Sequence, residues 1–183
     1  SGDVDRAIRG FEHIFTNAPI EDLKYEGGLR LVDAWLAKGD PTTALKVLDR
    51  LIVNLNLDED EPEIVASRIK ILIHQGAIDV LKKELLNLSG AASIRHPLYN
   101  DGMELSSLLD GNGEASDPRL QKYLKAERLI GQHKLTEAID LLLDIQGPGT
   151  SIADDARVRA IQLLLVLKKT DQATQVMDKF LDE

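Results

Sequence analysis

The sequence predicts an all-α protein of about nine helices, most of them joined in pairs as helical hairpins. Apolar residues recur at the spacing of one helix face, as Leu120 and Leu124 do. No stretch shows the sustained period-two alternation that is typical of a β-strand. Aromatic residues make up only 4% of the 183 residues while aliphatic residues are abundant, which suits helices packed by aliphatic side chains.

The clearest hairpin covers residues 117–146. Asp117 followed by Pro118 predicts a helix start, because Asp caps free backbone N–H groups and Pro suits the first helical turn. The polar run 131–134 separates the two helices, and the Gly-Pro-Gly sequence at 147–149 ends the second. A hairpin of about 30 residues cannot bury both apolar faces alone, so it needs neighbouring hairpins.

The other helices have similar boundary signals. Helices are predicted at residues 3–16, 21–38, 41–56, 62–75, 77–88, 97–109, 152–168 and 171–181. Turns or acidic breaks lie between the earlier ones, at residues 17–19, 38–41, 58–62 and 75–76. Irregular linkers are predicted near residues 89–96 and 110–116. We expect one domain over residues 1–183, taken as a part of a longer chain because Ser1 is not Met.

A small residue recurs after the turn in several hairpins. It is Ala7 in GDVDRAI, Ala44 in GDPTTAL, Ala138 in HKLTEAI and Ala173 in KKTDQAT, and Val80 fits between them. Ala44 lies 37 residues after Ala7, and Ala173 lies 35 residues after Ala138. This series resembles the tetratricopeptide repeat (TPR), whose period is about 34 residues.

The resemblance implies a right-handed superhelix of helical hairpins. The small residue would lie where the second helix crosses the first, and Trp35 and Leu129 match the family's large position nine residues earlier. The Pro that closes each repeat in the family is missing from most copies. Residues 79–183 are also similar to long bacterial TPR proteins, a likeness that transfers no catalytic residues.

In TPR arrays the first helices of successive pairs line a concave groove. The resemblance places Asp33, Tyr123, Glu127 and Gln162 at exposed positions there. A mixed acidic and polar lining would prefer extended peptides or helices that carry Lys or Arg. These four residues are therefore candidates for binding a protein or peptide segment.

A row of cations follows the helix after Pro118. Its members Arg119, Lys122, Lys125 and Arg128 recur every three residues, and Lys134 follows. Rows with this spacing drift around a helix, so the ribbon is only partly continuous. It is either a solvated face or a contact for an acidic peptide or a phosphate, and Lys122 and Arg128 join the peptide-binding candidates.

Composition and motifs argue against several other classes of function. The net charge of -9 is unsuited to a nucleic-acid or anionic-membrane surface, and no run of 18 apolar residues predicts a membrane-spanning helix. The chain has no Cys, which excludes disulfides, thiolate catalysis and Cys-ligated zinc. The four His residues are too scattered for a metal site. The run from Asp110 starts like a calcium loop but has Ala115 where Gly is needed, so a plain linker is favoured.

The sequence therefore predicts a non-enzymatic protein-interaction scaffold without cofactor or metal. The alternative is a structural spacer or self-association segment of a larger bacterial protein, such as an envelope protein. Exposed apolar ends of the array would then favour a homodimer. The compartment stays open between the bacterial cytoplasm and the periplasm or cell envelope.

Overall fold

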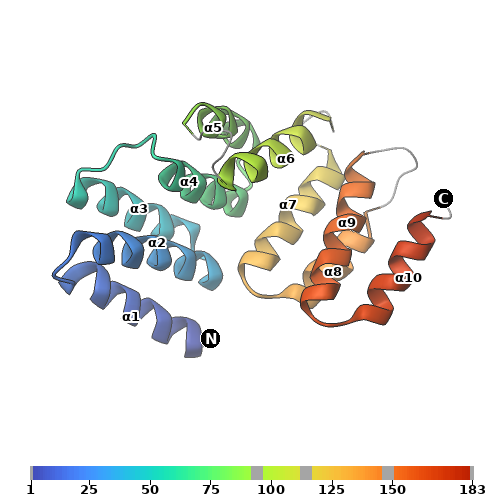
Figure 1. Ribbon diagram of the computed structural model, residues 1–183, viewed down its shortest axis with the longest axis horizontal. Coiled ribbons are helices and arrows are strands. Elements are labelled where there is room, and N and C mark those ends of the chain that lie inside the picture. The colour runs from blue at the N-terminus through green and yellow to red at the C-terminus, as the bar shows by residue number, and fades with distance from the viewer. Residues whose placement is uncertain (1, 92–96, 112–116, 146–150, 182–183) are drawn as a thin grey trace. The chain divides into compact units, whose positions relative to one another are not determined.

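Figure 1 shows the computed structural model, which describes residues 2–91, 97–111, 117–145 and 151–181. These residues form ten helices and no strand, which confirms the all-α class and corrects the expected count of about nine. The helices are α1 (Gly2–Asn17), α2 (Glu21–Lys38), α3 (Pro41–Leu55), α4 (Pro62–Gln75), α5 (Ile78–Ala91), α6 (Pro97–Gly111), α7 (Pro118–Gly131), α8 (Leu135–Leu143), α9 (Ser151–Val166) and α10 (Thr170–Leu181).

Both predicted linkers start later than expected. Helix α5 continues to Ala91. Near its end the side chain of Ser89 donates a hydrogen bond of 3.0 Å to the carbonyl oxygen of Leu85. Helix α6 likewise continues to Gly111. The remaining parts of the two linkers, residues 92–96 and 112–116, lie outside the described residues.

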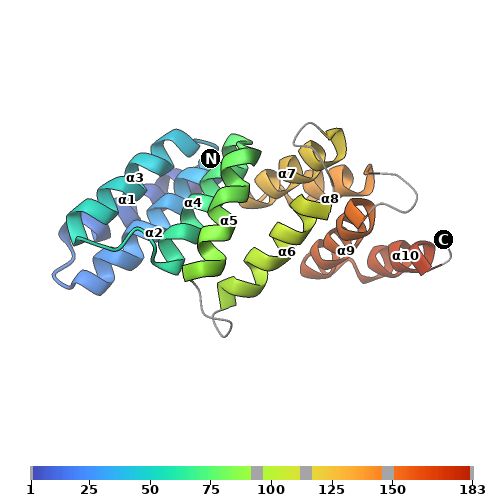
Figure 2. The ribbon, with the colours of Figure 1, turned by 90° about the horizontal axis from the view of Figure 1, so that it is seen from above.

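The chain divides into two compact units, Ser1–Ser106 and Ser107–Glu183, with the boundary inside α6. In the first unit α1 packs on α2, α2 on α3, α3 on α4 and α4 on α5. In the second unit α7 packs on α8, α8 on α9 and α9 on α10. Figures 1 and 2 show this sequential packing within each unit. The predicted pairing of neighbouring helices is thus confirmed.

Four hairpins share one turn geometry. We call α2, α4, α7 and α9 the first helices and α3, α5, α8 and α10 the second helices. Just beyond each first helix lies a residue with a positive φ angle: Gly39 (88°), Gly76 (72°), His133 (58°) and Lys168 (57°). The next residue donates its N–H to a carbonyl oxygen five residues earlier, a common helix ending: Asp40 to Trp35 (3.0 Å), Ala77 to Leu72 (3.2 Å), Lys134 to Leu129 (2.9 Å) and Lys169 to Leu164 (2.8 Å).

Substitutions at two of these turns are expected to change the free energy of unfolding in opposite directions. Gly39→Ala should lower the free energy of unfolding by about 1–2 kcal/mol, because an L side chain disfavours this backbone region. His133→Gly should raise it by about 0.5 kcal/mol, because relief of the same strain outweighs the entropy cost of Gly. Urea unfolding of both variants checks this, and a loss of stability in His133→Gly would contradict it.

The turn also corrects the position of the small residue in α5. Five residues after the positive-φ position stand Ala44, Leu81, Ala138 and Ala173. The prediction that Val80 takes this place is wrong, since Val80 is 51% exposed whereas Leu81 is 0% exposed. The reason is that Gly76 adopts the positive φ angle, and counting from it makes Leu81 the equivalent residue.

Each unit has its own aliphatic core. In the first unit the close approach of α1 and α2 depends on Gly27, where an added Cβ would lie 2.7 Å from Ile14 Cγ2 and 3.2 Å from the Phe15 nitrogen. The core there includes Phe15, Leu31, Val32, Leu36, Ala44, Val47, Leu48, Leu51, Ile64 and Ile71. In the second unit the buried residues include Leu120, Leu124, Ala138, Leu142, Ile145, Ile152, Ala156 and Ala160.

Two Asp residues cap helices as the sequence predicts for Asp117. Asp117 Oδ1 accepts the Arg119 N–H at 2.8 Å, and Asp40 Oδ1 accepts the Thr43 N–H at 2.9 Å. The pKa of Asp40 is lowered from its ordinary value of 3.8, chiefly by the Thr43 N–H and hydroxyl, since both hydrogen bonds favour the ionised carboxylate. The pKa of Asp117 is lowered mainly by the side chain of Arg119.

The cap of α3 predicts a pH-dependent difference in stability. A lowered pKa in the folded state means that the contribution is present above the ordinary value of 3.8 and is lost as pH falls through the folded value. Asp40→Ala should therefore be less stable than wild type at pH 7, and the gap should narrow below about pH 3.8. Urea midpoints at both pH values check this, with Asp40→Asn as a control that keeps a capping oxygen. An equal difference in stability between wild type and Asp40→Ala at both pH values would show that the ionised Asp40 carboxylate does not stabilise the cap.

Candidate protein-interaction surface

In the first unit an ion pair joins equivalent positions of two first helices. Asp33 lies six residues before Gly39, and Lys70 lies six residues before Gly76. The Lys70 Nζ atom is 2.8 Å from Asp33 Oδ1, and both side chains remain largely exposed to solvent. Helices α2 and α4 also contact each other directly. The predicted candidate Asp33 thus lies on a surface shared by neighbouring first helices.

The second unit has a related ion pair between α7 and α9, which are also in contact, although its cation stands three residues earlier relative to the turn. Arg159 donates to both carboxylate oxygens of Glu127, at 2.8 and 3.1 Å. Its third nitrogen lies 3.3 Å from Gln162 Oε1. Glu127 lies six residues before His133, and Gln162 six before Lys168. Arg159 therefore brings two of the predicted residues together.

We call these side chains the first-helix surfaces, one in each unit: Asp33 and Lys70 form that of the first unit, and Glu127, Arg159 and Gln162 that of the second. Sequence reasoning missed Lys70 and Arg159. The available signal for Lys70 was the same six-residue offset from a turn that places Asp33.

The other predicted candidates lie on α7. Tyr123 is half-buried one helical turn before Glu127, and Arg128 is half-buried beside it. Lys122 Nζ is 2.6 Å from Asp144 Oδ2, at the end of α8, and Arg119 is 2.7 Å from Asp117. Arg119 and Lys122 of the predicted row of cations thus form ion pairs with acidic residues of their own unit.

A polar cluster lies at the other end of α2. The hydroxyl of Tyr25 donates to Glu61 Oε2 at 3.4 Å, and Glu61 directly precedes α4. Burial raises the pKa of Tyr25 above its ordinary value, and the nearby charges of Glu63 and Glu61 raise it further. The phenol therefore stays protonated and donates this hydrogen bond at neutral pH.

A shallow depression of about 520 Å³ lies along α1, lined by Ile8, Arg9, Glu12, His13, Thr16, Asn17 and Trp35. Its Glu12 accepts two hydrogen bonds from Arg50 of α3, at 2.8 and 2.9 Å. The Arg50 guanidinium in turn lies 4.7 Å from the centre of the Phe15 ring. These contacts link α1 to α3 and give Glu12 a partner within the chain.

The described part of the chain offers neither a metal site nor a membrane-spanning helix. No group of three or more His, Cys, Asp or Glu side chains converges there in a way that could hold a metal ion. His96 and residues 112–116 of the candidate calcium loop lie outside it. No described helix is long and apolar enough to cross a membrane.

No protein-family model, curated protein or solved structure matches the chain. The hairpins and the first-helix surfaces are therefore the features of the chain that bear on its function.

Proposed function

We propose that the chain is a protein-interaction scaffold of the TPR type, which binds a segment of a partner protein along its first helices. The observation that carries the proposal is an ion pair between neighbouring first helices in each unit, Asp33 with Lys70 and Glu127 with Arg159, whose acids both lie six residues before their turns. In both units a cation of one first helix meets an acid of the preceding first helix. Within each unit an ion pair therefore joins neighbouring first helices, as we expect of a stacked array.

The chemistry of these surfaces suggests the kind of segment that they would bind. The Lys70 and Asp33 side chains are 52% and 38% exposed, so their ion pair contributes little to folding and can exchange partners at small cost, whereas Glu127 is only 19% exposed and is held through both oxygens. A segment with Lys or Arg would compete for Asp33 in the first unit or for Glu127 in the second, where its own backbone would hydrogen-bond to Gln162. Extended peptides and helices that carry cations fit these surfaces best.

Charge reversal tests the proposal. Asp33→Lys combined with Glu127→Lys should reduce the amount of captured partner protein at least about tenfold, which corresponds to about 1.4 kcal/mol of binding free energy. Affinity capture followed by mass spectrometry measures this. The matched control is Asp49→Lys with Asp140→Lys, which makes the same charge change at exposed positions of second helices. If the double variant on the first helices retains every partner, the first-helix surfaces are not the binding sites.

A further inference from the structure

The two acids of the first-helix surfaces are held in different ways. Lys70 reaches the Asp33 carboxylate at one atom, Oδ1, and no other described residue donates a hydrogen bond to Asp33. Arg159 donates to both carboxylate oxygens of Glu127, at 2.8 and 3.1 Å. A lysine ammonium makes a single-point contact on a flexible stem, whereas a bidentate arginine pair has a fixed geometry. Asp33 therefore exchanges its cation more readily than Glu127 does.

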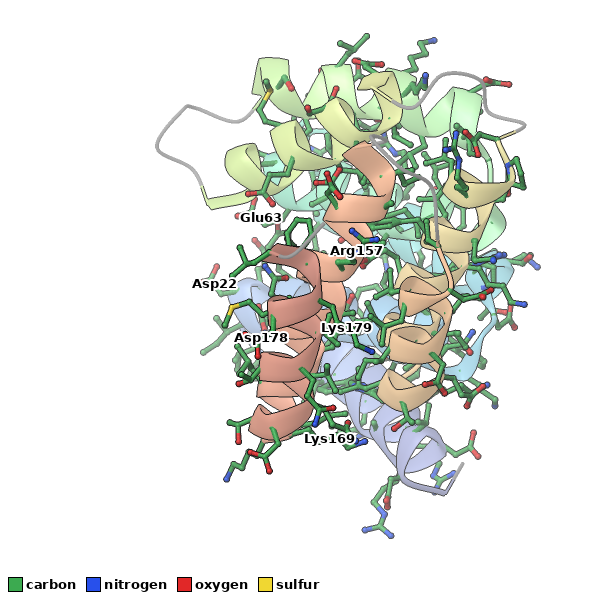
Figure 3. All side chains as sticks on the ribbon, turned by 90° about the vertical axis from the view of Figure 1, so that its right-hand side faces the viewer. Asp22, Glu63, Arg157, Lys169, Asp178 and Lys179 are labelled. Carbon is green, nitrogen blue, oxygen red and sulfur yellow. The ribbon has the colours of Figure 1, made fainter. Side chains whose placement is uncertain are left out.

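Other acids of the first unit lie near Asp33. Glu26 precedes Asp33 by seven residues, a spacing that places both side chains on one face of α2. Burial raises the pKa of Tyr25 most, and the nearby charges of Glu63 and Glu26 raise it further. Figure 3 shows Glu63 and Asp22 on the same side of the first unit. A cation that approaches this surface is thus attracted by more than one carboxylate.

The equivalent surroundings of Glu127 are less favourable to a cation. The residue seven positions before Glu127 is Leu120, which is 0% exposed, where α2 has Glu26. Helix α7 also contains more cations than acids, since Glu127 is its single acid and its cations are Arg119, Lys122, Lys125 and Arg128. A cationic segment is therefore better placed on the first unit than on the second.

Lys70 shows what kind of group Asp33 holds. Its ammonium is 2.8 Å from the carboxylate, and it comes from a different helix, 37 residues along the chain. The Lys70 side chain is 52% exposed, so the ammonium sits where a Lys or Arg of a partner segment would also sit. A partner cation can then reach Asp33 only in those molecules in which Lys70 has moved away.

The fold of the first unit does not depend on this ion pair. Helix α3 packs on both α2 and α4, and α2 also contacts α4 directly. The buried core that joins these helices includes Leu31 and Val32 of α2 and Ile64 and Ile71 of α4. Displacement of Lys70 from Asp33 therefore leaves the packing of the unit intact.

We propose that Asp33 binds the cation of the partner segment and that Lys70 is an internal competitor that lowers the affinity, whereas Glu127 is held by Arg159 as part of the fold. This role of Lys70 rests on the proposed function, because it requires a cationic segment that binds along the first helices. It adds the unit that binds the segment and the residue that regulates the binding.

The probe is selected with a displayed library of random peptides of about 12 residues, which extend to about 40 Å and so exceed the length of α2. Selection on the full chain should enrich peptides with Lys or Arg. One of them, labelled with fluorescein, is then measured by fluorescence anisotropy. Asp33→Asn should weaken its binding at least about tenfold, and Glu127→Gln should change it less than about twofold.

Lys70→Ala should strengthen binding of the same peptide about twofold to sixfold, because exposed ion pairs are only moderately stable and leave the acid free in part of the molecules. Lys70→Arg keeps the competing cation and should not strengthen binding. The matched control is Lys83→Ala, which removes the same charge at an exposed position of the second helix α5. Circular dichroism checks that each variant is folded.

The outcomes separate this proposal from the proposed function. If no cationic peptide is enriched, or if neither Asp33→Asn nor Glu127→Gln weakens binding, both are overturned. If Glu127→Gln weakens binding and Asp33→Asn does not, the proposed function stands and the assignment to the first unit is wrong. If Asp33→Asn weakens binding but Lys70→Ala has no more effect than Lys83→Ala, Lys70 is not a competitor.

Discussion

Replacing Leu81 with Ala should lower the free energy of unfolding of the first unit by about 2–5 kcal/mol. Leu81 is 0% exposed and follows the turn at Gly76 where Ala44, Ala138 and Ala173 follow theirs. Because the residues around α5 pack against the Leu81 side chain, its removal leaves a cavity that these neighbours can fill only in part. The same exchange at neighbouring Val80, which is 51% exposed, should change the stability by less than about 0.5 kcal/mol.

Urea unfolding followed by tryptophan fluorescence measures both variants. The chain has a single tryptophan, Trp35, which lies in the first unit and so reports on the unit that contains the mutations. If Val80→Ala lowered the free energy of unfolding more than Leu81→Ala, Leu81 would not be the residue equivalent to Ala44. The equivalence of the four hairpins would then fail for α5.

Removing the carboxylate of Glu84 is expected to cost about 1.5–3 kcal/mol, the range for hydrogen bonds to charged groups. Glu84 Oε1 accepts from Arg68 at 3.1 Å, and Glu84 Oε2 accepts from Asn87 at 3.2 Å. Both members of the ion pair are largely buried, with side-chain exposures of 22% for Arg68 and 12% for Glu84. Glu84→Ala therefore leaves the Arg68 charge in a poorly solvated position, 3.9 Å from the Glu59 carboxylate.

Replacing both partners should remove most of this penalty. The positions equivalent to Glu84 hold Val47, Leu141 and Val176 in the other second helices, so an apolar side chain suits this place in the hairpin. Arg68→Leu combined with Glu84→Leu should lie within about 1 kcal/mol of wild type, because no charge is left without its partner. A double-mutant cycle by urea unfolding measures the coupling. Additive single effects would show that the ion pair contributes nothing of its own.

The helix boundaries were the most predictable feature of this chain. Helices α2 and α4 span the predicted residues 21–38 and 62–75, because Pro62, Gly39 and Gly76 give local start and stop signals. The end of α5 was missed, since no Gly or Pro marks it before Gly90 and the helix continues past Ser89.

The candidate site was only partly predictable. The TPR resemblance placed Asp33, Glu127 and Gln162 at equivalent places relative to the turns, and the structure shows two of them joined by Arg159. Neither Lys70 nor Arg159 could be paired with its acid from the sequence. Their partners lie more than 30 residues away on another helix, and such a contact leaves no local pattern.

The sequence by itself determined the helices and their turns, because caps, Pro, Gly and apolar spacing act within one or two turns of chain. Only the tertiary structure decided which faces are covered. Leu48 and Met177 follow their turns at equivalent positions, yet Leu48 is 0% exposed and Met177 44%. The difference arises because α4 packs on α3, whereas the same face of α10 is exposed. Burial depends on neighbours far along the chain, and a single helix sequence does not contain that information.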